Sequence, residues 1–209
     1  SVSGHSVVML AINKELQLIL GIKDQLRPNL KSHLDELKQQ GVKEFAILSG
    51  DQPAVVKELQ KELNISQSYG GILPQEKAEI IKEFQTNGET VCFVGDGIND
   101  SPSLALADVG IAMGSGTDVA IETSDVVLMH SDFDHLNHAV GLAKAIRSNM
   151  RQNIIIALGT VLFLLWSLFF TDWLTMSIGM LVHEGSILVV ILNGIRLLRY
   201  KRRSVKNKL

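Results

Sequence analysis

Cysteine is almost absent from this 209-residue sequence, which contains only Cys92. A single cysteine excludes a disulfide framework, a CxxC redox pair and a zinc site built from this chain's thiolates alone. It also indicates a reducing compartment. Cys92 lies in the apolar run of residues 90–94, and this setting predicts a buried strand cysteine.

The two parts of the chain have opposite charge balances, and each has few side chains of one sign. Residues 1–134 contain 20 acidic and only 10 basic side chains, whereas residues 135–209 contain 2 acidic and 10 basic ones. The acidic first part argues against a nucleic-acid-binding surface, because such a surface concentrates Lys and Arg. It predicts a water-soluble domain. The basic second part requires a different environment.

Long uncharged apolar runs are absent before residue 153. Residues 153–170 then form a stretch that, at about 1.5 Å per residue, covers most of a bilayer core of roughly 30 Å. A second apolar stretch at 176–198 completes a predicted transmembrane hairpin. Basic residues flank its two outer ends, so the positive-inside rule places both termini in the cytoplasm, where phospholipid head groups are a sufficient partner. The alternative is a buried hairpin in a soluble protein, for which the remaining core is small.

Polar residues at 183–186 interrupt the second apolar stretch. Glu184 is the most informative, because an ionisable side chain inside a span costs about 2.5–3.5 kcal/mol and usually serves transport or pairing. His183, Glu184 and Ser186 together offer nitrogen and oxygen ligands to a divalent cation. The alternative is that Glu184 pairs with a helix outside this chain.

A second group of histidines precedes the first span. His135 and His138 share a predicted helix face near two aspartates, which is one pattern of a metal site. Apolar residues continue at helical spacing through 136–150, however, and this favours a stalk helix that leads to the membrane.

The soluble part alternates short apolar runs with helical patterns, which predicts a parallel sheet covered by helices. A hairpin of strands is expected at the beginning, over residues 7–12 and 16–22. The remaining expected elements are helices at 28–41, 53–63, 74–84 and 101–107, and strands at 44–48, 90–94, 109–112 and 125–128.

Two Gly-Asp clusters follow predicted strands, where ligands of parallel sheets collect. Ser49, beside Asp51, offers a hydroxyl and turn amides that suit a phosphoryl group, although such a turn also occurs without a ligand. Asp96 and Asp100 flank a glycine turn and suit Mg²⁺ with its waters. Lys77, early in a predicted helix, could add the positive charge that phosphoryl transfer needs.

These motifs occur in a fixed order with others, namely DQLRP at 24–28, LSGD at 48–51, LPQEK at 73–77, VGDGINDSPSL at 94–104 and AMGSGT at 112–117. Together with the two spans, they resemble the P-type cation-transporting ATPases over nearly the whole chain. The resemblance implies an α/β fold, in which a partial haloacid-dehalogenase-like Rossmannoid phosphorylation domain with a parallel sheet precedes a two-helix transmembrane hairpin.

The resemblance also implies roles for individual residues. Ser49, which is Thr in most members, would contact the phosphoryl group, and Lys77 would stabilise its charge. Asp96 and Asp100 would hold Mg²⁺, and Asn99 would support the phosphate site. The residues implied to shape these turns are Gly50, Asp51, Gly95 and Gly97.

Within that family, two spans after the phosphorylation domain resemble the heavy-metal (type IB) pumps. Residues 182–198 are similar to the zinc, cadmium and cobalt branch, since copper pumps place Met and Ser in this span. Ile187 replaces a Thr that is common there, which leaves the choice among these three ions open. The implied function is ATP-driven export of a divalent heavy metal across the plasma membrane through an aspartyl phosphate.

The implied organisation is a phosphorylation domain at 1–131 without its acceptor-aspartate strand, a stalk helix at 132–152, spans at 153–170 and 176–198, and a basic cytoplasmic tail at 199–209. The family's DKTGT motif, actuator domain, nucleotide domain and other spans do not occur in this sequence. We therefore expect the chain to be the carboxyl-terminal part of a pump, inactive by itself. The alternatives are a membrane-anchored phosphatase of the same superfamily and a non-catalytic product of a split or truncated pump gene.

Overall fold

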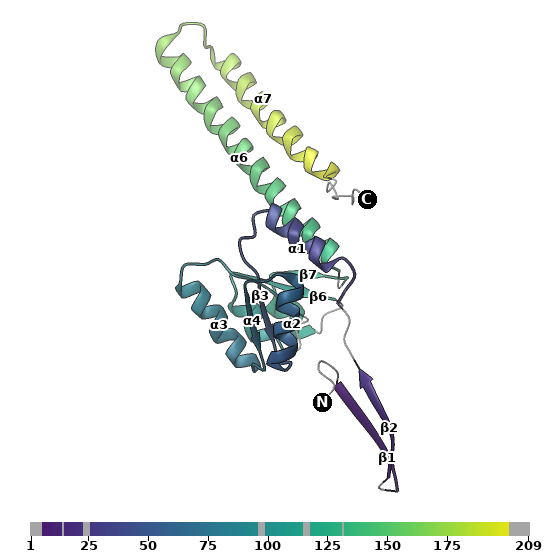
Figure 1. The fold of residues 1–209 in the computed structure, drawn as a ribbon. Coiled ribbons are helices and arrows are strands. Elements are labelled where there is room, and N and C mark those ends of the chain that lie inside the picture. Colours follow the sequence, from purple (N-terminus) through teal and green to yellow (C-terminus); the bar gives the residue numbers. More distant parts are fainter. Residues whose placement is uncertain are drawn as a thin grey trace. The chain divides into compact units, whose positions relative to one another are not determined.

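The computed structural model describes residues 6–13, 15–22, 26–95, 99–114, 118–130 and 132–200 (Figure 1). The chain divides into two compact units, a first unit of Ser1–Leu136 and a second unit of Asn137–Leu209.

The first unit begins with an antiparallel hairpin of β1 (Ser6–Ile12) and β2 (Glu15–Ile22). Asn13 adopts a positive φ of 54° in the connection, a conformation that Asn tolerates better than most residues. Met9 and Leu10 are neighbours that point to opposite faces of the hairpin, yet both are exposed. The hairpin was predicted correctly.

The next elements form a two-stranded parallel sheet. After α1 (Leu30–Gln39), the strands β3 (Ala46–Ser49) and β4 (Gln67–Gly70) pair in parallel and are connected by α2 (Pro53–Leu63). α2 starts with Pro53, whose fixed φ suits a first helical turn, and it buries Val56 and Leu63. This arrangement brings the ends of β3 and β4 to one edge.

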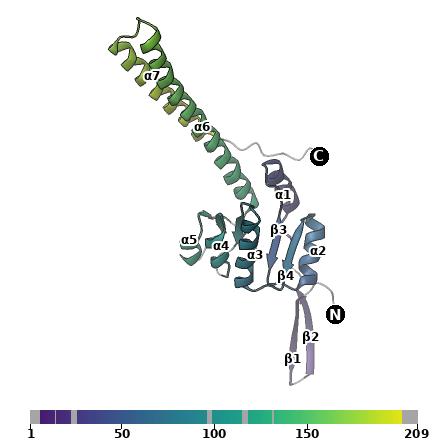
Figure 2. The ribbon, with the colours of Figure 1, turned by 90° about the vertical axis from the view of Figure 1, so that its left-hand side faces the viewer.

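A three-stranded parallel sheet forms the rest of the first unit. Its order is β5 (Cys92–Gly95), β6 (Val109–Met113) and β7 (Val126–Leu128). Ile81, Phe93, Leu104 and Ala112 form a buried cluster on it. The accompanying helices, visible in Figure 2, are α3 (Pro74–Thr86), α4 (Ser101–Leu106) and α5 (Asp118–Thr123).

The parallel α/β character was predicted correctly, but three details differ. The sheet occurs as two pieces rather than one, and the strand β4 and the helix α5 were not expected. The prediction of a buried Cys92 is wrong, because Cys92 is exposed. It alternates with Phe93 along β5, so it faces away from the cluster that buries Phe93.

The second unit consists of two long helices. α6 (Phe133–Phe170) starts at the end of the first unit, and α7 (Met176–Ile195) is followed by the 3-10 helix η1 (Arg196–Arg199). Both long helices are long and apolar enough to cross a membrane, and Phe169 remains 77% exposed. They fit a transmembrane hairpin. The stalk expected at 132–152 and the span expected at 153–170 lie within one continuous helix.

Candidate functional site

The end of β3 carries the first predicted cluster. The Ser49 hydroxyl donates to Asp51 Oδ2 at 2.8 Å and accepts from the Asp51 amide at 3.1 Å. The loop after β4 binds the same turn, because the Gly71 amide donates to the Asp51 carbonyl at 2.6 Å and the Ile72 amide to the Ser49 carbonyl at 3.2 Å. Gly71 has a φ of 72°, which a glycine adopts without strain. Four backbone and side-chain hydrogen bonds therefore fix this turn.

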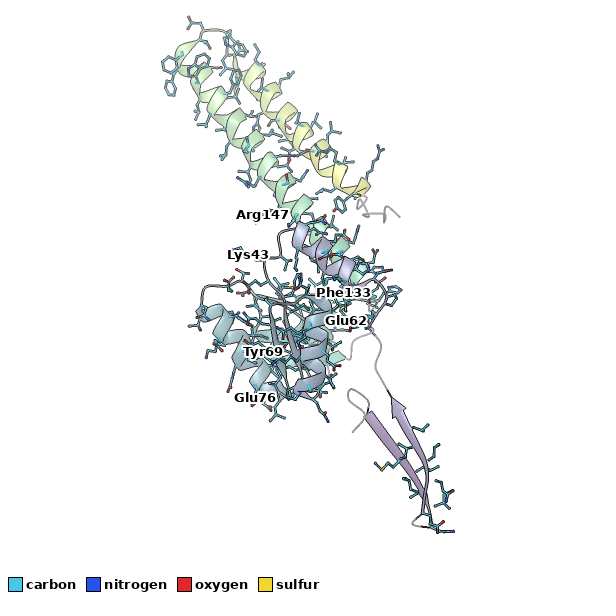
Figure 3. All side chains as sticks on the ribbon, viewed as in Figure 1. Lys43, Glu62, Tyr69, Glu76, Phe133 and Arg147 are labelled. Atoms are coloured by element: carbon cyan, nitrogen blue, oxygen red, sulfur yellow. The ribbon has the colours of Figure 1, made fainter. Side chains whose placement is uncertain are left out.

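Lys77 is placed by the start of α3. Pro74 opens the helix, and Glu76, labelled in Figure 3, accepts the Leu73 amide through Oε2 at 2.6 Å. A glutamate that reaches back to the N-cap amide is half of a capping box and stabilises the first turn. Lys77 Nζ lies 2.7 Å from Asp100 Oδ1, and the two side chains are only 12% and 13% exposed. The helix after β4 is thus tied to the loop after β5.

The loop after β5 places Asp100 at the N-cap of α4. Gly95 lies directly beneath this carboxylate, since a Cβ on Gly95 would be 2.7 Å from Asp100 Oδ2 and 3.0 Å from the Phe93 ring. Asn99 is exposed in the turn before Asp100. Asp96 and Gly97 lie outside the described residues.

The predicted residues thus form two pairs at carboxyl ends of parallel strands, Ser49 with Asp51 and Lys77 with Asp100. Gly50 lies between the members of the first pair, and a Cβ there would meet only the Ile72 carbonyl oxygen, at 3.6 Å. Within the described residues no hydrogen bond joins the two pairs. The arrangement offers oxygen ligands and one ammonium group, the chemistry required to bind a phosphoryl group and a hard divalent cation.

The polar residues of α7 do not converge. His183 and Glu184 are exposed neighbours on the helix, and the Ser186 hydroxyl donates to the His183 carbonyl at 2.7 Å. Among the described residues, no three His, Cys, Asp or Glu side chains are placed to hold a metal ion. This includes the region of His135, which lies 3.7 Å from Asp132 and stacks on His130.

Several residues that shape these regions were missed from the sequence. Gly70 allows α2 to approach β4, because a Cβ there would lie 2.7 Å from the Pro53 Cα. The capping role of Glu76 was detectable, since an acid at the third helical position is a known signal. In the second unit, Asn149 and Asn193 join the helices through an amide-to-carbonyl hydrogen bond of 2.7 Å, which only the paired helices reveal.

Comparisons with known proteins identify the family of the chain. The model of the haloacid dehalogenase-like hydrolases matches residues 3–108. A "Zinc-transporting ATPase" of Bacillus subtilis is 39% identical over 94% of this chain and 31% of its own length, and a "Probable cadmium-transporting ATPase" of Listeria monocytogenes is 37% identical over 95% and 28%.

A solved structure supports the same assignment. The crystal structure of a zinc-transporting PIB-type ATPase in the E2·Pi state has a TM-score of 0.80 at 37% identity, and the match covers 94% of this chain and 32% of that one. The chain thus spans about a third of the length of its relatives. It belongs to the haloacid dehalogenase-like hydrolase family, and its resemblance to the heavy-metal P-type ATPases is confirmed over nearly its whole length.

Proposed function

We propose that this chain supplies part of the phosphoryl-transfer site and two membrane-spanning helices of an ATP-driven exporter of a divalent heavy metal. The observation that carries this proposal is the nearly buried Lys77–Asp100 pair at the carboxyl ends of parallel strands. The similarity to zinc- and cadmium-transporting ATPases supports the same activity. The acceptor aspartate, the nucleotide domain and the actuator domain would belong to the rest of the pump, and the chain alone would not turn over ATP.

The site residues of this chain would bind and orient the phosphoryl group and offset its negative charge. Ser49 would contact the phosphoryl group with the hydroxyl that now donates to Asp51, and the turn amides would contribute further donors. Lys77 would place its ammonium group against the phosphoryl oxygens, where it offsets negative charge that develops during transfer. Asn99 would support the same site from its exposed turn.

The carboxylate of Asp100 suits Mg²⁺. Gly95 leaves room beneath it that a Cβ would fill, and carboxylate oxygens are the ligands that Mg²⁺ prefers. Asp100 and Asp96 would hold the ion, with Gly95 and Gly97 shaping the turn between strand and helix. When bound, Mg²⁺ would neutralise charge on the transferred phosphoryl group.

His183, Glu184 and Ser186 would lie on the path of the transported ion. Glu184 is exposed on a predominantly apolar helix, so inside a bilayer it requires a partner from outside the described residues or the ion itself. Nitrogen and oxygen ligands favour a divalent ion such as Zn²⁺, Cd²⁺ or Co²⁺ over Cu(I).

The surroundings of the chain follow from the same proposal. α6 and α7 would cross the plasma membrane with both ends of the chain in the cytoplasm, as the basic residues at their outer ends favour. The β1–β2 hairpin, exposed on both faces, would pack against a preceding part of the pump, because an isolated two-stranded hairpin is at best marginally stable.

Metal resistance of cells tests the phosphoryl-transfer site. In the complete protein, Asp96→Ala or Asp100→Ala should abolish resistance to the exported ion, whereas Asp35→Ala, an exposed acid of α1, should leave it unchanged. Retained resistance in the Asp100→Ala strain would remove Asp100 from the site.

Metal-stimulated ATPase activity tests the ion path separately. Glu184→Ala in the complete protein should abolish stimulation by Zn²⁺, Cd²⁺ and Co²⁺ without lowering the melting temperature. Unchanged stimulation would show that Glu184 does not contact the transported ion.

A further inference from the structure

We propose that a hollow in the second unit binds the phosphate of an anionic phospholipid. This inference rests on the proposed membrane crossing of α6 and α7. The hollow has a volume of about 240 Å³. It is lined by Ala145, Ser148, Asn149 and Gln152 of α6 together with Arg196, Leu197 and Tyr200 at the end of the chain's described part.

The hollow lies where apolar sequence gives way to charged sequence. Its α6 residues precede the uncharged run that starts at residue 153, and its remaining residues follow α7, at the end of the second apolar stretch. Both sets therefore mark the level at which a bilayer's hydrocarbon core meets its head groups. Basic pockets between membrane helices at this level are suited to bind lipid head groups.

The charge of the hollow is uncompensated within the second unit. Arg196 is exposed and forms no ion pair with any described residue. The only acids after residue 134 are Asp172, in the connection between α6 and α7, and Glu184, which at about 1.5 Å per residue lies roughly 18 Å along the helix from Arg196. An anion that pairs with Arg196 would therefore come from outside this unit.

A network of amides holds the guanidinium in place. Arg196 Nη1 donates to Asn193 Oδ1 at 3.0 Å, and Asn193 Nδ2 donates to Asn153 Oδ1 at 2.9 Å and to Gln152 Oε1 at 3.2 Å. Asn149, 6% exposed, donates to the Asn193 carbonyl. These bonds use the acceptors of Asn193 and Gln152, so the Gln152 amide nitrogen and the other Arg196 N–H groups are left to donate to an anion.

The aromatic wall of the hollow is also fixed. The ring of Tyr200 packs against His138 of α6 with ring centroids 5.6 Å apart. This contact keeps Tyr200 beside α6, so its phenol is available as a neutral donor near Arg196. The site therefore combines one cation with several neutral donors, a combination that suits a phosphate ester.

Size and surroundings favour a lipid. A volume of about 240 Å³ is below the roughly 300–1,000 Å³ of sites for drug-sized ligands, so a single phosphate group fits better than a nucleotide. Leu198, 85% exposed, and Leu192 are apolar side chains of the same helical end, and acyl chains would cover them. Free phosphate would leave these side chains uncovered.

Native mass spectrometry of the complete protein tests the site. The protein, extracted from washed membranes with neutral detergent, is titrated with phosphatidylglycerol against phosphatidylcholine. Arg196→Gln should weaken retention of phosphatidylglycerol about tenfold, because a charge-assisted hydrogen bond is lost. Arg199→Gln, which removes the same charge from η1 outside the hollow, should retain it as the wild type does.

A second variant and a competition experiment distinguish a lipid site from a site for free phosphate. Tyr200→Phe should weaken retention two- to fivefold without changing the charge, so it tests the site even where Arg196→Gln alters folding. The site would be contradicted if Arg196→Gln and Arg199→Gln lost phosphatidylglycerol retention equally. It would also be contradicted if neither Arg196→Gln nor Tyr200→Phe weakened that retention. Displacement of phosphatidylglycerol by inorganic phosphate at equal concentration would overturn the lipid assignment. If the wild-type protein were released from the membranes without detergent, that result would instead contradict the membrane hairpin.

Discussion

Lys77 and Asp100 are charged side chains that water barely reaches, since they are 12% and 13% exposed. Each stabilises the charge of the other, and removal of one leaves a poorly solvated charge behind. Lys77→Gln should therefore lower the free energy of unfolding of the first unit by about 1–3 kcal/mol. Denaturant titration of the purified chain measures this change.

The same helix provides the control for this prediction. Lys82 is an exposed residue of α3 that forms no ion pair with any residue the structure describes, so Lys82→Gln should change the free energy of unfolding by less than about 0.5 kcal/mol. Equal effects of the two substitutions would mean that the Lys77–Asp100 pair contributes nothing beyond surface charge.

Asp108 makes the stability of the first unit depend on pH in the acid range. The Val91 amide donates to Asp108 Oδ2 at 2.8 Å and, with a smaller contribution from the Gln85 side chain, lowers the pKa of Asp108 below its usual 3.8. A lowered pKa in the folded state stabilises that state at pH values above 3.8, and this contribution is lost as the pH falls through the folded-state pKa.

The measurement is a series of thermal melts of the chain and its Asp108→Asn variant from pH 6 to pH 2.5. The variant should melt at a lower temperature at pH 6, and the difference should shrink steadily below pH 3.8. A difference that is constant over the whole range would show that the charge of Asp108 does not contribute. Asp35→Asn, in α1, should show no such trend.

At the scale of elements, α6 and α7 are joined by side-chain amides rather than by apolar contacts alone. Asn193 bonds Asn149, Asn153 and Gln152 of α6. Interhelical hydrogen bonds in membrane proteins are worth about 0.6 kcal/mol on average and up to roughly 1.7 kcal/mol. Asn193→Leu should thus lower the melting temperature of the hairpin in detergent, as followed by circular dichroism of the chain.

The control for Asn193→Leu is the loss of a hydrogen bond that lies within a single helix. The Thr160 hydroxyl donates only to the Ile156 carbonyl of its own helix, at 2.8 Å, so Thr160→Val should leave the melting temperature nearly unchanged. If Asn193→Leu behaved like Thr160→Val, the amide network would have no part in holding the helices together.

Local signals decided which elements could be predicted. α2 and α3 each begin with a proline and carry helically spaced apolar residues, so their starts were predicted to the residue. β4 was missed because Gln67, Ser68 and Tyr69 show no apolar run and the strand forms only by pairing with distant β3. Likewise, the division into two sheets depends on pairing between distant segments, which periodicity does not report.

The candidate site was predictable to a similar degree. A strand-end motif identified Asp100, and the start of a predicted helix identified Lys77, as candidate members of one site. The structure adds that the two side chains form an ion pair. The fit of Gly95 beneath Asp100 depends on tertiary packing, as does the network around Asn193. The adjacency of His183 and Glu184 in α7 predicted a shared ion site, which stays a prediction. Both side chains are exposed, and within the described residues they belong to no group of three possible metal ligands.

For the whole molecule, charge and structure divide at nearly the same place. The acidic residues 1–134 correspond to the first unit, and the basic remainder contains the two apolar helices of the second. Under the proposed function, the first unit would supply phosphoryl-transfer residues and the helices of the second would cross the membrane. The chain spans only about a third of its zinc- and cadmium-transporting relatives, so its activity has to be measured in the complete protein.

The most direct measurement is the amount of acid-stable phosphoprotein that the complete protein forms from γ-phosphate-labelled ATP in the presence of Zn²⁺. The wild type and Asp35→Asn should become labelled, and Asp100→Asn should be labelled at least tenfold less, because the carboxylate that pairs with Lys77 is lost. Equal labelling of Asp100→Asn and the wild type, or no labelling of the wild type, would contradict the proposal that this chain supplies a phosphoryl-transfer site.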